Sequence, residues 1–293
     1  PTYQTMLAKA AATSSGGGDS FSGVTTDLYI HYDFSNTDSW NRTNGTNTDD
    51  YTIHNLANDY NDGLLRSRTG SSTTYRNASD SPCIDFNSSD GGGCLEWIPS
   101  NNSSNADDCA FVIPGQLTST STGNYLYNLP TVSSTDTNNL FNGIGTGAFT
   151  YEIWFKVYLD HSQDTAITFF KLMGKDTSNS NTTHSITSFS AGYDYDVSRA
   201  SKIKFTPTTS YLPISGTPSS GAAWSDWQHV VYSRNSTSTN DTKIYFNNSL
   251  DVTYTDDQNL DYMRYFYLSI ISSANTVPLR QGIFRFYRGK ALT

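Results

Sequence analysis

Apolar and polar residues alternate along many short stretches of the chain. In residues 28–34 and 149–157 the apolar side chains occupy every second position. Because successive side chains of a strand point to opposite faces, this period of two predicts strands with one buried face. Shorter runs of the same kind occur at 83–86, 94–98, 109–113, 166–172, 186–191, 202–206, 228–234, 243–246, 265–271 and 282–288.

Turn residues separate these runs, and no helical period interrupts them after residue 27. Short segments rich in Asn, Asp and Gly stand at 90–93, 142–143, 247–248 and 256–257. Many short strands with frequent turns predict an all-β sandwich or barrel. Longer loop-like stretches run over 35–52, 99–108 and 207–226. The last holds three prolines and two glycines, and long loops in compact domains are often functional.

The first residues differ from the rest. Residues 1–12 are rich in alanine and other helix formers, and a Ser/Gly-rich linker follows at 14–18. We predict a short helical arm with its linker over 1–23, in which residues 1–20 contact another protein. A frayed terminus is the alternative. Residues 24–293 are predicted to form one β domain, since all-β folds of this length occur as single domains.

Charge and hydropathy exclude some partners. The net charge is −9 and the chain has no cluster of Lys and Arg, whereas nucleic-acid-binding proteins carry basic patches that neutralise phosphates. No apolar run approaches the ~18 residues of a transmembrane helix, so no membrane insertion is expected. The start of the chain also lacks a basic stretch followed by an apolar one, the pattern of a signal peptide.

The cysteines leave two possibilities open. There are three, Cys83, Cys94 and Cys109, so at most one internal disulfide can form and its pairing is undetermined. Alternatively, all three are buried thiols. Their spacing fits no zinc site.

Several strand sequences resemble, in family order, those of laminin-G-like domains of the concanavalin-A-like lectin/glucanase superfamily. The sequence Trp227-Gln228-His229-Val230 is similar to the family's Trp-x-His-Val strand. The hairpin at 243–250 follows it, with Asn248 where the family usually has glycine, a replacement that Asn allows because it tolerates positive φ. The other matching segments are 32–34 with 55–65, 84–86 with 94–98, 149–156, and 282–293. The resemblance covers about 27–293, apart from long insertions at 99–147 and 207–226. It implies an antiparallel two-sheet jelly-roll sandwich.

Catalysis is not expected. Glycoside hydrolases use a pair of carboxylates, and on this fold the pair alternates along one strand as Glu-x-Asp-x-Glu, a run that this chain lacks. Glu96 and Glu152 are isolated and predicted to face solvent, while Asp194 and Asp196 alternate at a turn. No histidine belongs to a Ser or Cys motif, and His229 is interpreted as a packing residue.

Carbohydrate binding is the sharper hypothesis. Flat aromatic rings pack against the apolar face of a sugar while nearby polar groups bind its hydroxyls. Trp154 and Trp227 are predicted to lie in or near the core, and Trp40 and Trp97 are left open. With 20 tyrosines in the chain, some loop tyrosines arise by chance. The candidate glycan-binding residues are Tyr193, Asp194, Tyr195, Asp196, Tyr211, Trp224 and Asp226.

A turn at 58–63 concentrates oxygen-bearing side chains. It would suit calcium, with Asp59 and Asp62 as candidate ligands, but it lacks the glutamate and the length of an EF-hand loop. The alternative is an Asx/Gly turn between strands. No other cofactor is predicted.

Together these features favour a non-enzymatic surface-display or adhesion protein. We predict a virion component such as a capsid decoration, knob or fibre, present in many copies or as a homo-oligomer, because the chain resembles an extracellular adhesive domain while no secretion signal is visible. The recurrence of laminin-G-like domains in marine viral structural proteins adds to this expectation. Its arm would contact the capsid or neighbouring subunits, and glycans are the expected surface ligands. The alternative is a secreted or cell-surface lectin, in which the Asn-x-Ser/Thr sequons would be glycosylation acceptors.

Overall fold

All elements in the described part of the chain are β-strands. The computed structural model describes residues 26–40, 52–58, 62–67, 84–87, 93–97, 109–113, 144–160, 165–168, 170–175, 181–184, 189–193, 202–205, 211–213, 222–257, 259–260, 263–268 and 279–292. The predicted all-β class is confirmed for these ranges, and the predicted helical arm lies outside them. Within the same ranges, no helix is long and apolar enough to cross a bilayer.

The largest sheet has nine strands and is built around β7 (Phe149–Asp160), which pairs with β15, β19 and β14. All pairings in it are antiparallel. Its main path is β17 (Ser249–Tyr254), β16 (Thr242–Phe246), β15 (Gln228–Arg234), β7, β19 (Leu279–Arg288), β5 (Cys94–Trp97) and β4 (Ile84–Asn87), with β1 (Leu28–Asp33) beside β19 and β14 (Ala222–Trp224) beside β7.

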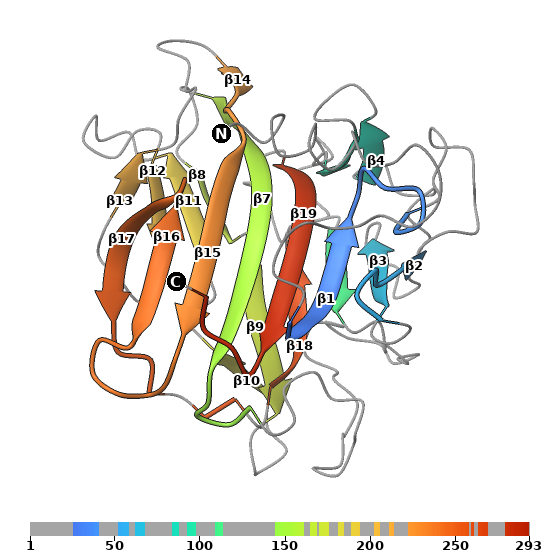
Figure 1. The fold of residues 1–293 in the computed structure, drawn as a ribbon. Helices are drawn as coiled ribbons and strands as arrows, with labels where there is room; N and C mark the ends of the chain where they lie inside the picture. Colours follow the sequence, from blue (N-terminus) through green and yellow to red (C-terminus); the bar gives the residue numbers. More distant parts are fainter. Residues whose placement is uncertain are drawn as a thin grey trace.

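Two smaller antiparallel sheets lie behind the nine-stranded sheet in the view of Figure 1. The six-stranded sheet runs in the order β10 (Asn181–His184), β9 (Phe170–Lys175), β18 (Met263–Leu268), β6 (Cys109–Ile113), β3 (Gly63–Ser67) and β2 (Thr52–Ile53). The four-stranded sheet runs in the order β13 (Tyr211–Pro213), β12 (Lys202–Phe205), β11 (Phe189–Tyr193) and β8 (Thr165–Thr168).

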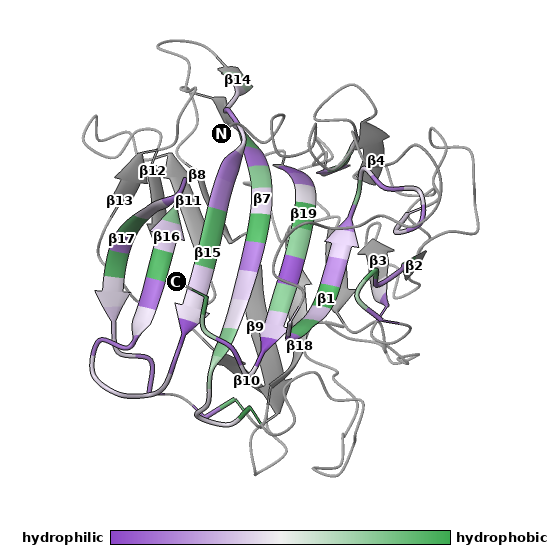
Figure 2. Cartoon of the chain, in the orientation of Figure 1, coloured by the Kyte–Doolittle hydropathy of each residue, from purple (hydrophilic) through white to green (hydrophobic). Residues whose placement is uncertain are grey.

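One face of the nine-stranded sheet, here the inner face, carries an aromatic core. Tyr151, Ile153 and Phe155 alternate along β7 and are at most 2% exposed. Tyr151 stacks on Tyr232 of β15, with 4.9 Å between ring centroids, and such pairs stabilise beyond the area they bury. Figure 2 shows the underlying alternation as hydrophobic and hydrophilic bands along β7 and β19. The aromatic residues that the sequence distributes over its strands therefore build this core.

The opposite, outer face is crossed by the end of the chain. Thr150 Oγ1 donates to the carbonyl of Lys290 at 2.9 Å and accepts from the amide of Leu292 at 3.0 Å. Ser233 Oγ donates to the carbonyl of Leu292 at 2.7 Å. In Figure 1 the end marked C accordingly lies in front of the sheet.

The segment 207–226 is not one long loop, as its prolines suggested. It contains β13 and β14. β13 is the outermost strand of its sheet and ends at Pro213, a position at which a missing N–H costs no ladder hydrogen bond. β14 pairs with the last residues of β7, Trp224 opposite Tyr158 and Ala222 opposite Asp160. This pairing also carries β7 three residues beyond its predicted end.

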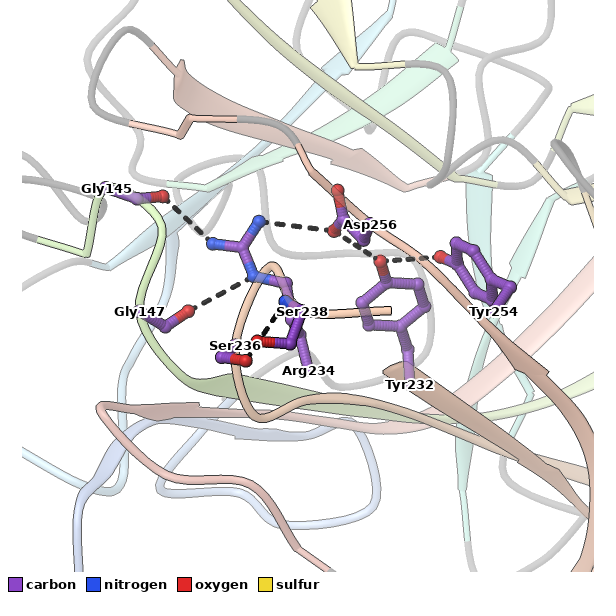
Figure 3. A network of polar contacts seen from close by, with 8 residues as sticks. All are labelled: Gly145, Gly147, Tyr232, Arg234, Ser236, Ser238, Tyr254 and Asp256. Carbon is purple, nitrogen blue, oxygen red and sulfur yellow. Dashed lines mark hydrogen bonds and ion pairs between the residues drawn. The ribbon is translucent and has the colours of Figure 1, made fainter. Parts of the chain in front are cut away.

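A buried polar network closes one end of the nine-stranded sheet (Figure 3). Arg234 and Asp256 form an ion pair of 3.2 Å between side chains that are both 0% exposed. The guanidinium also donates to the carbonyls of Gly145 at 2.9 Å and Gly147 at 3.1 Å. Tyr232 donates its hydroxyl to Asp256 at 2.7 Å. The network thus joins β15 to the segments that precede β7 and follow β17.

The turn between β16 and β17 confirms the expectation for Asn248, whose φ is 71°. Asn247 before it also has a positive φ, 49°, but its side chain has a further role. Its Oδ1 accepts from the amide of His229 at 2.9 Å and its Nδ2 donates to Gln228 Oε1 at 2.9 Å. The Asn247 side chain therefore links the turn to β15 by hydrogen bonds, whereas the role assigned to Asn248 is its backbone conformation.

We expect Asn248→Gly to raise the free energy of unfolding by about 0.5 kcal/mol, because glycine adopts positive φ without strain in such turns. Asn247→Gly should instead lower it by about 1 kcal/mol or more, since two hydrogen bonds to β15 are lost. Urea unfolding of the two variants beside the unmodified chain measures both effects. Equal changes would show that the Asn247 side chain adds nothing.

Candidate functional site

Aromatic and charged side chains, rather than a plain polar surface, line the outer face along β7. Alternate residues of this strand point to that face, and each is paired with or packed beside residues of neighbouring strands. The β7 members are Glu152, Trp154, Lys156 and Tyr158, and their neighbours are Arg285, His229, Arg280 and Trp224. We call these eight residues the outer-face strip. It divides into a buried lower part around Glu152 and a more open upper part around Trp224.

The lower part is centred on Glu152, which is buried and not directed to solvent as the sequence suggested. Arg285 Nη1 donates to Glu152 Oε1 at 2.7 Å, His229 Nε2 lies 3.5 Å from the same oxygen, and Trp154 Nε1 donates to it at 3.4 Å. Trp154 stacks on His229 with centroids 4.1 Å apart. The prediction that Trp154 and His229 are packing residues is confirmed, but the glutamate beside them is part of the same cluster.

Electrostatics fix the charge state of this lower part. Burial on its own raises the pKa of Glu152, but Arg285 and hydrogen bonds from His229 and Trp154 outweigh it and lower the pKa to about 2. Burial lowers the pKa of His31, on β1, to about 3, with Arg285 adding to the effect and Glu152 opposing it. Near neutral pH the carboxylate is therefore ionised and His31 is neutral. Neither group holds a proton that it could donate as a general acid at that pH.

The upper part is built around Trp224, at the end of β14. The guanidinium carbon of Arg280 lies 4.0 Å from the centroid of the Trp224 ring, and Tyr158 contacts the same ring edge-on at 5.4 Å. Arg280 Nε donates to Glu96 Oε2 at 2.8 Å, and these two side chains are only 14% and 15% exposed. A cation–π contact and a charge-assisted hydrogen bond thus hold the half-buried indole in place.

A second half-buried indole, Trp227, lies three residues further along the chain. Lys156 Nζ stands 5.4 Å from its ring centroid. Trp227 also packs against Trp154 and Ile283, which agrees with the prediction that it lies near the core. Both indoles of the upper part are therefore backed by a cation and leave part of their surface open to solvent.

Between the two indoles, a tightly bonded turn presents Asp226 to solvent. Ser225, which is buried, donates its amide to the carbonyl of Val157 at 2.9 Å, and its Oγ accepts from the Val157 amide at 3.2 Å. Ser225 Oγ and Gln228 Nε2 both donate to the Asp226 carbonyl at 2.8 Å. The peptide of Asp226 is fixed, while its carboxylate makes no hydrogen bond or ion pair to the described residues. We call this upper part the Trp224–Trp227 site; its members are Glu96, Lys156, Tyr158, Trp224, Asp226, Trp227 and Arg280.

The predicted glycan-binding residues are only partly gathered here. Trp224 and Asp226 belong to the site. Tyr193 ends β11 and Tyr211 begins β13, strands of the four-stranded sheet that flank β12. Asp194, Tyr195 and Asp196 lie outside the described residues.

Sequence reasoning missed the residues that brace the indoles. Arg280 and Glu96 are 184 residues apart, and nothing local to either residue indicates the other. The one available signal was the similarity of 227–232 to a family strand, which placed Trp227 at the start of a strand beside the loop that holds Trp224. Trp40, left open by the sequence, is a core residue that is 2% exposed and contacts Phe34 edge-on at 5.8 Å.

The calcium prediction rests on a turn whose described residues are bonded to one another. Asp62 Oδ1 accepts from the amide of Asn55 at 2.9 Å, and Oδ2 lies 3.1 Å from His54 Nδ1. Asn55 Oδ1 in turn accepts from the amide of His31 at 2.8 Å. Asp59 lies outside the described residues, and among those described no three metal-binding side chains converge. Calcium binding stays a prediction.

The cysteines are divided between elements. Cys94 is fully buried at the start of β5, in the nine-stranded sheet. Cys109 begins β6 in the six-stranded sheet, and Cys83 lies outside the described residues. The pairing of the three stays undetermined.

Comparisons with known proteins identify similar solved structures but no family. No family model matches the chain, and no curated protein matches it. Among solved structures, it is similar to the receptor-binding domain of botulinum neurotoxin D, with 11% identity over 92% of this chain and 51% of that one and a TM-score of 0.41. A carbohydrate esterase of the Shiga toxin-encoding bacteriophage phi24B gives 11% identity over 92% and 100%, with a TM-score of 0.45. Domain 4 of AbnA, a GH43 extracellular arabinanase from Geobacillus stearothermophilus in complex with arabinotriose, gives 15% over 91% and 94%, with a TM-score of 0.42. The chain spans about half the length of the neurotoxin domains that it matches.

Proposed function

We propose that this chain is a non-enzymatic carbohydrate-binding protein and that the Trp224–Trp227 site binds the sugar. One observation carries the proposal. A turn fixed by Ser225 and Gln228 holds the exposed Asp226, and two half-buried indoles flank this residue in the sequence, each in contact with a cation.

Each part of this arrangement suits a sugar. The indoles offer flat apolar surfaces for the C–H face of a pyranose, and Asp226 can accept hydrogen bonds from its hydroxyls. Arg280 and Lys156 hold the rings through cation–π contacts. Because the turn and the rings are fixed before binding, little conformational entropy is lost when the ligand arrives.

The carboxylates near the site favour binding over hydrolysis. A glycosidase needs one carboxyl group with a raised pKa that protonates the leaving oxygen, and a second carboxylate at a set distance. Glu96 is bonded to Arg280, and the pKa of Glu152 is lowered rather than raised. Both glutamates are therefore partners of arginines in ion pairs.

The wider setting is proposed from the sequence. We place the site on a concanavalin-A-like jelly-roll sandwich that serves as a virion surface component, a capsid decoration, knob or fibre, with residues 1–20 contacting the capsid or a neighbouring subunit. The alternative is a secreted or cell-surface lectin. Mass spectrometry of the chain isolated from its source separates the two, since occupied Asn-x-Ser/Thr sequons indicate passage through a secretory pathway and favour the lectin.

The test of the site is a glycan array followed by calorimetry with the strongest ligand. Trp224→Ala, Trp227→Ala and Asp226→Ala should each weaken binding by about tenfold or more, as expected for central contacts of a binding site. Leu250→Ala is the matched control, because Leu250 is 52% exposed on β17, away from the site. Thermal unfolding of each variant confirms folding.

Two results would contradict the proposal: no glycan bound by the unmodified chain, or glycan binding that survives all three substitutions. Asp226→Ala is the safest of the three, because the Asp226 side chain is exposed and only its carbonyl has a structural role.

A further inference from the structure

We infer that the Trp224–Trp227 site selects neutral glycans over glycans that carry a carboxylate or sulfate, and that Asp226 sets this preference. The inference rests on the proposed function and adds a ligand class to it. It follows from where the charges of the site lie and which of them are already compensated.

Arg280 is the side chain that would be expected to bind an acidic sugar, since guanidinium groups bind carboxylates and sulfates with paired hydrogen bonds. Here its Nε donates to Glu96 at 2.8 Å and its guanidinium carbon lies 4.0 Å from the centroid of the Trp224 ring. Both members of the ion pair are mostly buried. Arg280 therefore enters the site with its charge balanced by Glu96, and it positions the indole rather than receiving an anion.

Lys156 is the other cation of the site. Its ammonium group lies over the Trp227 ring at 5.4 Å, and on the sheet it stands beside Arg280, which stands beside Glu96. The site thus holds two cations, Lys156 and Arg280, and two carboxylates, Glu96 and Asp226, of which Arg280 and Glu96 form an ion pair. The formal charges of these four residues sum to zero, but Asp226 is the one of them that is exposed, whereas the other three are partly buried.

An acidic sugar would therefore meet Asp226 first. An ionised carboxylate only accepts hydrogen bonds, so it can bind the hydroxyls of a neutral sugar and repels a second anion. The net charge of the chain, −9, acts in the same direction at longer range. A neutral sugar gains the Asp226 contact without repulsion.

The experiment compares matched glycan pairs that differ in one anionic group, with the full chain as the binding protein. Suitable pairs are lactosamine with sialyl-lactosamine, and cello-oligosaccharides with the same oligosaccharides oxidised to carboxylates at C6. The neutral member of each bound pair should bind about five- to tenfold more tightly, the effect of a partly screened like-charge contact.

Two substitutions test the assignment. Asp226→Asn keeps the shape and an acceptor oxygen but removes the charge, so the gap within each pair should close. Glu96→Gln removes the carboxylate that balances Arg280, so the affinity for the acidic member should rise. Both variants are read in the same assay beside Leu250→Ala, which should leave the gap unchanged.

The outcomes separate this inference from the proposed function. Acidic members bound as tightly as neutral ones or more tightly, with binding still lost in Trp227→Ala, would overturn the neutral preference and leave the carbohydrate site standing. A gap that persists in Asp226→Asn would overturn the role of Asp226. If no member of any pair binds, the proposed function fails together with the preference.

Discussion

Replacing Asp256 by alanine is expected to lower the free energy of unfolding by about 3–5 kcal/mol, the range measured when one partner of a buried ion pair is removed. Arg234 is 0% exposed, so its charge would stay in the interior without its carboxylate. The carbonyls of Gly145 and Gly147 would still accept from it (Figure 3) but carry no formal charge. The hydroxyl of Tyr232 would also lose its acceptor.

Urea denaturation followed by fluorescence gives the size of this effect. The double substitution Arg234→Met with Asp256→Leu should recover a large part of the loss, because it removes both charges together and fills the space with apolar atoms. Asp251→Ala is the control, since Asp251 is an exposed carboxylate on the neighbouring strand β17. A loss at Asp256 no larger than that at Asp251 would show that the buried pair contributes nothing.

Most of the strands could be predicted from the sequence, and the reason is local. The alternation at 28–34 and 149–157 depends only on which residues are apolar, and both strands form as expected. The extension of β7 to Asp160 could not be predicted, because β14, more than sixty residues further along the chain, supplies the partner for those last positions. β13 and β14 were missed for a different reason, since the three prolines and two glycines of residues 207–226 suggested a loop.

The site was predictable only where its members are close in sequence. Trp224 and Asp226 were found from the aromatic and acidic composition of one loop. The error on Glu152 has a physical cause, because a period of two was taken to mean that the second face meets water. At Glu152 that face is covered by Arg285, 133 residues away, and by His229 on the neighbouring strand. Long-range pairs of opposite charge leave no local pattern.

The lowered pKa values of His31 and Glu152 predict that the protein loses stability in acid over a defined pH range. In the folded protein the pKa of His31 is lowered from its ordinary value of 6.5 to about 3, and the pKa of Glu152 is lowered from 4.5 to about 2. Both shifts are downward, so the unfolded chain binds protons that the folded chain does not, and stability falls as the pH falls. Of these two groups, only His31 lowers the free energy of unfolding between about pH 6.5 and 4.5. Below pH 4.5, Glu152 lowers it further. A group that is protonated in the unfolded chain and unprotonated in the folded one changes the free energy of unfolding by about 1.4 kcal/mol per pH unit.

From pH 6.5 to 4.5, His31 should therefore remove about 2–3 kcal/mol of unfolding free energy. Urea unfolding at a series of pH values measures the slope, and His31→Gln should flatten it within this window even if that variant is less stable throughout. His54→Gln is the matched control, because the His54 side chain is 54% exposed. A slope that survives in His31→Gln would assign the acid sensitivity to another group. A flattened slope would show that the acid sensitivity comes from His31, which burial beside Arg285 keeps neutral in the folded protein.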